Sequence, residues 1–273
     1  LYLLFSEELQ LLIDRKKIHK FYEKTSKNYS QNIFYEADTE YQKNILDNIR
    51  KHLNLSTKSK LASIGCGNGS IESTLARLCN LKEKILVVDS NEKMLDYARS
   101  DNYLESILMN GLKFVKDPNF HYDKCLLKEV VHHFSENEIH EIYQGIYNQL
   151  SEGGTTLTIT RNQETEYPFF LEAIEKWQQI QPPLELFIKA QEISGFEVTL
   201  EEVSYRMYVS KKDWVDMLRN RFWSHLSEIE DDRLDKGITE IEERYKELET
   251  LSFNDCLIFL IGRKLPLIQS DSS

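Results

Sequence analysis

The stretch LASIGCGNGS, residues 61–70, decides how this chain folds. An apolar run leads into Gly65, Gly67 and Gly69, and a helical stretch begins near Ser70. Glycine accepts positive φ angles and leaves no Cβ in the way of a ligand, and the first turn of a helix presents free N–H groups. We therefore interpret the stretch as a strand, a ligand-binding loop and a helix, with a plain tight turn as the simpler alternative.

Short apolar runs and helical stretches alternate outward from this loop. Strands are expected at 60–64, 84–88, 106–109, 122–127, 155–160, 196–205 and 256–261, and helices at 70–79, 92–100, 136–149, 168–179, 183–194, 211–222 and 228–249. Such alternation is typical of βαβ units around a parallel sheet. The expected fold class is α/β, a doubly wound, mostly parallel, Rossmann-like seven-stranded sheet with helical cap elements.

Composition argues against several classes of protein. A net charge of -11 without clustered Lys and Arg makes nucleic acid a poor partner. No apolar stretch approaches the roughly 18 residues of a membrane span, so a soluble protein without a membrane partner is expected. Cys66, Cys79, Cys125 and Cys256 show no paired spacing, which argues against a zinc site or a disulfide framework and favours a cytoplasmic location.

An acidic residue follows the glycines at a suitable distance. Asp89 lies twenty residues beyond Gly69, directly after the apolar run 85–88. An acid at the end of the second strand can accept hydrogen bonds from ribose hydroxyls. Asp89 could also cap the helix that is expected to begin near Asn91, and the two roles are compatible.

With these residues the chain resembles the class I S-adenosylmethionine-dependent methyltransferases, specifically their small-molecule branch, similar to the trans-aconitate and juvenile hormone acid methyltransferases. The motifs that carry the resemblance lie within residues 60–161. GCGNG at 65–69 resembles the family's GxGxG loop, whereas the dinucleotide fingerprint GxGxxG would need a glycine at Ser70. The resemblance implies S-adenosyl-L-methionine as cofactor and S-adenosyl-L-homocysteine as product.

The resemblance also implies which residues contact the cofactor: Ser63, Gly65, Cys66, Gly67, Asn68, Gly69, Asp89, Ser90, Met94, Asn110, Gly111 and Lys128. Ser63 stands where many relatives have an acidic residue, which weakens the assignment of a contact to the cofactor's amino group. Asn110 also replaces an acid, but its amide oxygen can still accept from the adenine amine. Met94 is either a neighbour of the adenine or an ordinary core residue.

The segment 122–134 resembles the family's fourth-strand motif, whose end borders cofactor and acceptor. Glu129, His132 and His133 are the catalytic candidates there. A histidine can take a proton near neutral pH, which a phenol or alcohol acceptor would require and a carboxylate or free amine would not. A surface position for Glu129 and a structural role for the two histidines are the alternatives.

Acceptor contacts are expected from aromatic side chains outside these motifs. The candidates are Tyr22, Tyr29, Trp177 and Trp214, together with His133. Most aromatic residues at helical spacing are core residues, so only a few should touch the acceptor. Five basic residues could bind an anionic acceptor or be solvated helix surface: Lys211, Lys212, Arg206, Arg219 and Arg221.

The expected organisation is one α/β domain with added helices. Residues 1–51 are predicted to be an N-terminal helical cap segment and 52–161 the cofactor-binding core. Residues 162–264 should form the C-terminal part of the sheet with helical cap insertions, and 265–273 a tail. Because the chain does not begin with Met, residues upstream of Leu1 are expected to be missing.

The predicted activity is methyl transfer to an O or N atom of a small-molecule acceptor by direct in-line attack. The sequence shows no metal-ligand spacing, so no metal is expected. A catalytically inactive cofactor-binding protein is the alternative from another class. An NAD(P)-dependent oxidoreductase is a further alternative, which the glycine spacing disfavours.

Overall fold

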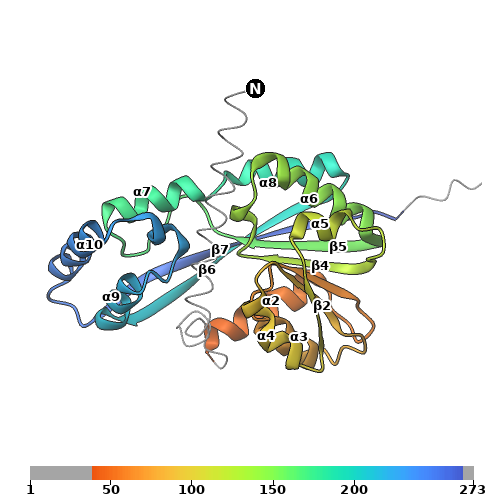
Figure 1. Ribbon diagram of the computed structural model, residues 1–273, viewed down its shortest axis with the longest axis horizontal. Coiled ribbons are helices and arrows are strands. Elements are labelled where there is room, and N and C mark those ends of the chain that lie inside the picture. The colour runs from red at the N-terminus through yellow and green to blue at the C-terminus, as the bar shows by residue number, and fades with distance from the viewer. Residues whose placement is uncertain (1–38, 267–273) are drawn as a thin grey trace, which may run out of the picture. The chain divides into compact units, whose positions relative to one another are not determined.

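The computed structural model describes residues 39–266 (Figure 1). Tyr22, Tyr29 and most of the predicted N-terminal cap segment lie outside these residues. Within them the chain forms two compact units. One unit, here called the sheet unit, contains Glu40–Asn162, Pro182–Val203 and residues 257–266. The other, here called the aromatic unit, contains Gln163–Gln181 and Ser204–Cys256.

A seven-stranded sheet has the strand order β3-β2-β1-β4-β5-β7-β6. The strands are β1 Leu61–Ile64, β2 Ile85–Asp89, β3 Leu104–Leu108, β4 Tyr122–Lys128, β5 Leu150–Thr160, β6 Glu197–Ser210 and β7 Thr250–Arg263. Neighbouring strands from β3 to β5 pair in parallel, and β7 pairs antiparallel with β5. This topology confirms the predicted α/β, mostly parallel, Rossmann-like sheet.

Helices cover both faces of the sheet in the sheet unit (Figure 1). On one face lie α5 Gly111–Lys116, α6 Glu136–Gln149 and α8 Leu184–Ser194, and on the other α2 Glu40–Leu53, α3 Ser70–Leu78 and α4 Glu92–Ser100. The core under α5, α6 and α8 contains Ile64, Leu127, Phe114, Ile142 and Phe187. Gly145 lets α6 approach α5 closely, because an added Cβ would lie 2.6 Å from Val115.

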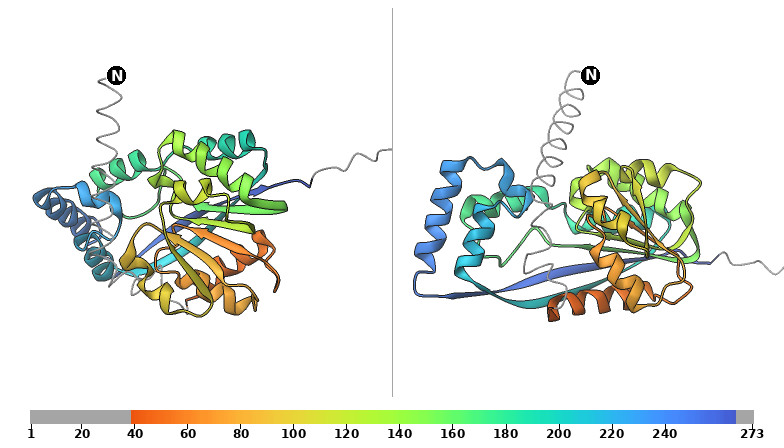
Figure 2. Two further views of the ribbon diagram at one scale, coloured as in Figure 1. Left: turned by 45° about the vertical axis from the view of Figure 1, so that its right-hand side comes forward. Right: turned by 60° about the horizontal axis from the view of Figure 1, so that its bottom comes forward.

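The aromatic unit contains α7 Leu171–Ile180, α9 Lys211–Arg219 and α10 Asp231–Arg244, with α9 and α10 side by side (Figure 2). Its core is an aromatic cluster of Tyr167, Phe169, Trp177, Trp214, Trp223 and Phe253. Two of the polar groups in this core, the Trp214 indole and the Tyr167 hydroxyl, have hydrogen-bond partners. Trp214 Nε1 donates to the Pro168 carbonyl at 2.9 Å, and the Tyr167 hydroxyl donates to Asp255 at 2.6 Å.

Two differences from the expected elements have simple causes. Strand β7 begins at Thr250 instead of 256, because Leu251, Phe253 and Asp255 are buried in a period of two that the sequence reading missed. Helix α5 was not predicted, since its six residues are too few to show a helical period. No helix between residues 39 and 266 is long and apolar enough to cross a membrane.

Candidate functional site

The loop between β1 and α3 has three residues in the left-handed region. The φ angles are 71° at Gly65, 59° at Gly67 and 73° at Gly69. The Gly65 N–H donates to the Val88 carbonyl of β2 at 2.8 Å, and Gly69 is the N-cap of α3. A Cβ at Gly65 would lie 2.3 Å from Val130, so this position requires glycine for packing as well as for conformation. The predicted strand, loop and helix are confirmed.

The side chain of Asp89, at the end of β2, is hydrogen-bonded to the glycine loop. Its Oδ2 accepts from the Gly67 N–H at 2.9 Å, and its Oδ1 accepts from the Asn91 N–H at 2.8 Å. The N-cap of α4 is Asn91, whose side chain accepts from the next backbone N–H groups, so the capping role considered for Asp89 was wrong. A carboxylate oxygen can accept more than one hydrogen bond. Asp89 can therefore orient the loop and bind a hydroxyl at the same time.

Of the remaining residues near the loop that are implied to contact the cofactor, Met94 and Asn68 also stabilise the local structure. Met94 is buried, and its Cε would lie 3.1 Å from a Cβ at Gly67. The Asn68 side chain accepts from the Ser70 N–H at 3.1 Å and stabilises the entry to α3. Ser90 is exposed. Met94 thus packs against the loop as a core residue would, and its contact with adenine stays a prediction.

Asn110 and Gly111 lie where β3 leads into α5. The Asn110 side chain is the N-cap of α5 and accepts from the Leu112 N–H at 2.9 Å. A Cβ at Gly111 would lie 2.9 Å from Ile64, so glycine allows α5 to start close to β1. The amide oxygen that was expected to accept from the adenine amine is already engaged in capping, although it retains a second lone pair.

Glu129 directly follows Lys128, the last residue of β4, and has a φ of 54°, which non-glycine residues rarely adopt. Its carboxylate forms an ion pair with Arg161 through Oε2, while Oε1 is buried without a hydrogen-bond partner among the described residues. Arg161 also donates to the Tyr41 hydroxyl of α2 at 3.4 Å. Backbone strain of this kind gathers at functional sites.

His132 and His133 form a short 3₁₀ helix together with Val131. Their rings are half-buried, with centroids 4.1 Å apart. They come shortly after Val130, whose side chain packs against Gly65. The structure therefore brings the segment with the three catalytic candidates beside the glycine loop, and a catalytic role for any of them stays a prediction.

One residue of this region was missed by the sequence reading. The Ser63 hydroxyl of β1 donates to Glu72 Oε1 in the first turn of α3 at 2.6 Å, and both side chains are buried. Glu72 lies on the same helix face as the buried residues Leu75 and Ala76. Two features of the sequence could have identified Glu72. It is a carboxylate at a helix position that faces inward, and it lies opposite Ser63, the serine that replaces an acid.

Burial and neighbouring charges shift two acids in this region. Burial raises the pKa of the Glu72 carboxyl, against the Ser63 hydroxyl, the carboxyl's own backbone N–H and Lys128, which lower it. Burial also raises the pKa of the Cys66 thiol well above its usual range, and the charges of Glu72 and Asp89 raise it further. Cys66 is therefore a protonated thiol and not a thiolate nucleophile.

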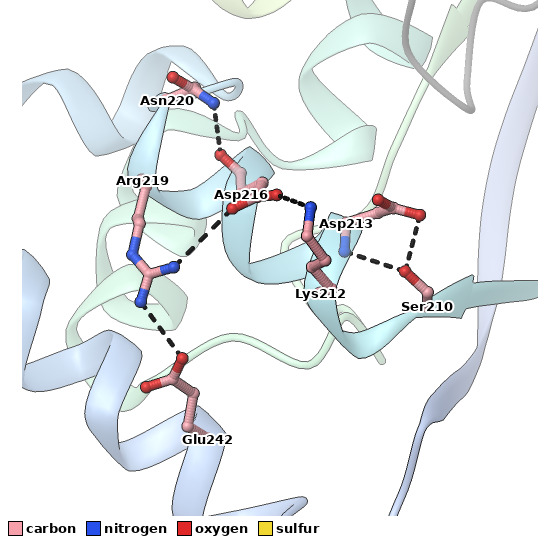
Figure 3. Close-up of polar contacts among 7 residues, drawn as sticks. All are labelled: Ser210, Lys212, Asp213, Asp216, Arg219, Asn220 and Glu242. Carbon is pink, nitrogen blue, oxygen red and sulfur yellow. Dashed lines mark hydrogen bonds and ion pairs between the residues drawn. The ribbon is translucent and has the colours of Figure 1, made fainter.

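The aromatic and basic acceptor candidates lie in the aromatic unit. Trp177 and Trp214 are buried in its core, and their contact with an acceptor stays a prediction. All five basic candidates have partners within this unit: Lys212 with Asp216, Arg219 with Asp216 and Glu242, Arg221 with Asp231, Arg206 with Ser252, and Lys211 with the Tyr245 carbonyl. Figure 3 shows the part of this network around α9. Such pairings are typical of solvated surface residues, on or next to α9 for four of the five and on strand β6 for Arg206.

Possible metal ligands and a surface hollow are the last two features to consider. Among residues 39–266, no group of three or more His, Cys, Asp or Glu side chains could hold a metal ion. A surface hollow between α5, α6 and α8 is lined by Lys116, His121, His140 and Glu141, among others. The hollow lies at the end of α5 that leads into β4 and along α6 from His140 to Gln149.

The model of the methyltransferase domain family matches residues 62–154. The fold is similar to that of the YcgJ protein from Bacillus subtilis, with 14% identity over 82% of this chain and 99% of that chain and a TM-score of 0.59. A putative methyltransferase from Bacillus halodurans gives 16% identity over 81% and 98% and a TM-score of 0.56.

A third structure of similar fold is phosphoethanolamine N-methyltransferase 2 of Haemonchus contortus, solved with phosphomonomethylethanolamine and S-adenosylhomocysteine. It gives 15% identity over 91% of this chain and 60% of that chain, with a TM-score of 0.58. No curated protein matches the chain in sequence. Residues 62–154 therefore match a methyltransferase domain, and the fold is similar to that of solved methyltransferases.

Proposed function

We propose that this chain transfers the methyl group of S-adenosylmethionine to an oxygen or nitrogen atom of a small-molecule acceptor by direct in-line attack. The observation that carries the proposal is a convergence within the sheet unit. The glycine loop follows β1, Asp89 is the last residue of β2, and Glu129 follows β4, and these three strands are parallel neighbours in the sheet. Ligands of open α/β sheets bind at these carboxyl ends.

The residues of the loop fit this cofactor. Glycines at positive φ let a ligand approach the backbone, and the Asp89 carboxylate, which accepts from the Gly67 N–H, is the type of group that accepts hydrogen bonds from ribose hydroxyls. When bound, the cofactor supplies a methyl group on a sulfonium that an acceptor heteroatom can attack. The protein's task is then to align that heteroatom with the methyl group, which can supply much of the acceleration.

Glu129, His132 and His133 are proposed to face the acceptor. The strained backbone at Glu129 and its Oε1, which has no hydrogen-bond partner among residues 39–266, suit a group that orients an amine or takes a proton. The Haemonchus protein holds a small phosphorylated amine, and a small-molecule acceptor is proposed for this chain as well. The likeness in fold supports the proposal that the chain belongs to the small-molecule branch.

The proposal extends to organisation and location. Residues 52–161 serve as the cofactor-binding core, and the helices within 162–264 act as cap insertions. The net charge of -11 supports an acceptor other than nucleic acid. All four cysteines are free thiols, which supports a reducing cytoplasm as the location.

Calorimetric titration with S-adenosylhomocysteine and with NADH tests the cofactor. The wild type should bind only the first, and Asp89→Ala should weaken this binding by about 10-fold to 100-fold, the loss typical of hydrogen bonds to a charged group. Asp96→Ala on the exposed side of α4 is the matched control and should leave the dissociation constant unchanged. Binding of NADH alone, or an unchanged dissociation constant in folded Asp89→Ala, contradicts the proposal.

Turnover against a panel of amines, carboxylic acids and phenols tests the acceptor class. Single-turnover rates of Glu129→Ala, His132→Ala and His133→Ala across pH then identify a base, if the acceptor requires one. Cofactor binding without methylation of any acceptor would instead support a catalytically inactive cofactor-binding protein. A methylated enzyme intermediate would exclude direct transfer.

A further inference from the structure

Glu72 is a buried carboxylate with one oxygen left over. Ser63 is 1% exposed and Glu72 3%. The Ser63 hydroxyl donates to Oε1 at 2.6 Å, while Oε2 is buried and has no hydrogen-bond partner within residues 39–266. Burying an ionised carboxylate is costly unless it is paired. The arrangement is therefore incomplete until Oε2 carries a proton or meets a cationic group.

Glu72 lies next to the glycine loop, in the first turn of the helix that follows it. It is the third residue of α3 after the N-cap Gly69. A glutamate at this place commonly turns back to the N-cap N–H, but here it reaches sideways to β1. Its charge acts on Cys66 of the loop, on Asp89 after β2 and on Lys128 at the end of β4. Glu72 is thus surrounded by the segments that the cofactor is proposed to contact.

The chemistry of Oε2 selects its ligand. An oxygen acceptor in a buried site binds a group with N–H donors, and a positive charge on that group offsets the buried negative charge. A metal ion would need several further ligands, and none gather there among the described residues. S-adenosylmethionine carries two positive centres, of which the sulfonium has no hydrogen to donate and the α-ammonium has three.

We propose that Glu72, anchored by Ser63, binds the α-ammonium group of S-adenosylmethionine. The inference rests on the proposed function, because it assigns one contact of the same cofactor. It also accounts for Ser63: the serine holds, from β1, a carboxylate that α3 supplies. The charge of Lys128 lowers the pKa of the Glu72 carboxyl, but burial raises it by more.

The test removes the amino group from the ligand and the charge from the protein. Calorimetry compares S-adenosylhomocysteine with its analogue in which hydrogen replaces the α-amino group. The wild type should bind the analogue about 10-fold to 100-fold more weakly, as expected for a charge-assisted hydrogen bond. Glu72→Gln should bind the two ligands within about 3-fold of each other. Its amide oxygen can still accept from Ser63, which preserves the fold.

Two further variants keep the test decisive. Ser63→Ala leaves the carboxylate charged but loosens it, so discrimination between the ligands should fall between wild type and Glu72→Gln. Ser210 and Asp213 form a similar pair at the start of α9, with the hydroxyl 2.7 Å from the carboxylate on an exposed surface (Figure 3). Asp213→Asn is the matched control and should discriminate like the wild type.

The outcomes separate this inference from the proposed function. If Glu72→Gln is folded by circular dichroism and still discriminates as the wild type does, the ammonium assignment is wrong while cofactor binding stands. If the wild type binds neither ligand, both the assignment and the proposed function fail.

Discussion

The glycine loop with its flanking residues and the aromatic cluster differ in how their buried polar groups are paired. In the cluster, Trp214 and Tyr167 are buried with their polar atoms paired, and rings fill the space between them. Around the loop, the backbone is strained at Glu129, and Glu72 and Glu129 each keep a buried oxygen without a hydrogen-bond partner in the described chain. The cluster also contacts His225, whose two ring nitrogens are buried without a partner in the described chain, but a neutral imidazole costs less to bury than a carboxylate. The groups left over around the loop are carboxylate oxygens, which a ligand with hydrogen-bond donors can satisfy.

The largest expected effect is on the cluster. Trp214→Ala should lower the free energy of unfolding by about 3–5 kcal/mol, because the wholly buried indole leaves a cavity that its neighbours fill only in part. Urea denaturation measures the change. Tyr208→Ala is the control, since that ring is 70% exposed and its loss should cost less than about 0.5 kcal/mol. Equal costs for the two variants would show that the cluster is not a packed core.

The next effect depends on pH and concerns His225, whose ring lies against Phe169 and Trp177. Burial lowers its pKa from 6.5 to about 3. Between these values the unfolded chain binds a proton that the folded chain does not, so stability falls as pH decreases. The loss amounts to about 1.4 kcal/mol for each pH unit below 6.5, until the folded pKa is reached.

Substitution His225→Phe isolates this contribution, because it removes the titrating group and retains an aromatic ring. The variant should lose less stability than the wild type when urea denaturation is repeated between pH 7 and pH 4. Since all other titrating groups are shared, identical pH dependence in the two proteins would contradict burial of a neutral histidine.

The smallest effect on stability, and the sharpest on binding, is expected at the loop. Gly67→Val places a branched side chain at a φ of 59°, which should cost about 1–2 kcal/mol. Its Cβ would also enter the space needed by the cofactor, so binding of S-adenosylhomocysteine should be lost in calorimetry. Gly153→Val is the matched control: the φ is 73°, and the nearest atom to an added Cβ is 4.0 Å away. Binding that survives at Gly67 would remove the loop from the cofactor site.

Much of the sheet unit could be predicted from the sequence. The helix Glu92–Ser100 and the helix Glu136–Gln149 have the expected bounds, because apolar periodicity and the capping residues Asn91 and Ser135 mark them locally. The glycine loop could be placed for the same reason. Positive φ is a property of single residues, and glycine is the residue that adopts it readily.

Other features depended on contacts between distant segments. From the sequence, Ser63 was interpreted as the replacement of an acid. In the structure its hydroxyl donates a hydrogen bond to the carboxylate of Glu72, nine residues later in α3. The aromatic residues at helical spacing could line a site or fill a core. Only the structure showed that Tyr167, Trp177 and Trp214 pack against one another, and a contact of Trp177 or Trp214 with an acceptor stays a prediction.

The sequence by itself determined the order of strands and helices, the glycine loop and the acid that follows it, because period, propensity and backbone freedom are written in neighbouring residues. Tertiary structure alone decided which side chains keep unused hydrogen-bonding capacity. Burial and hydrogen-bond partners depend on how β1, α3 and β4 pack together. This packing leaves Glu72 and Glu129 each with a buried carboxylate oxygen that has no partner in the described chain.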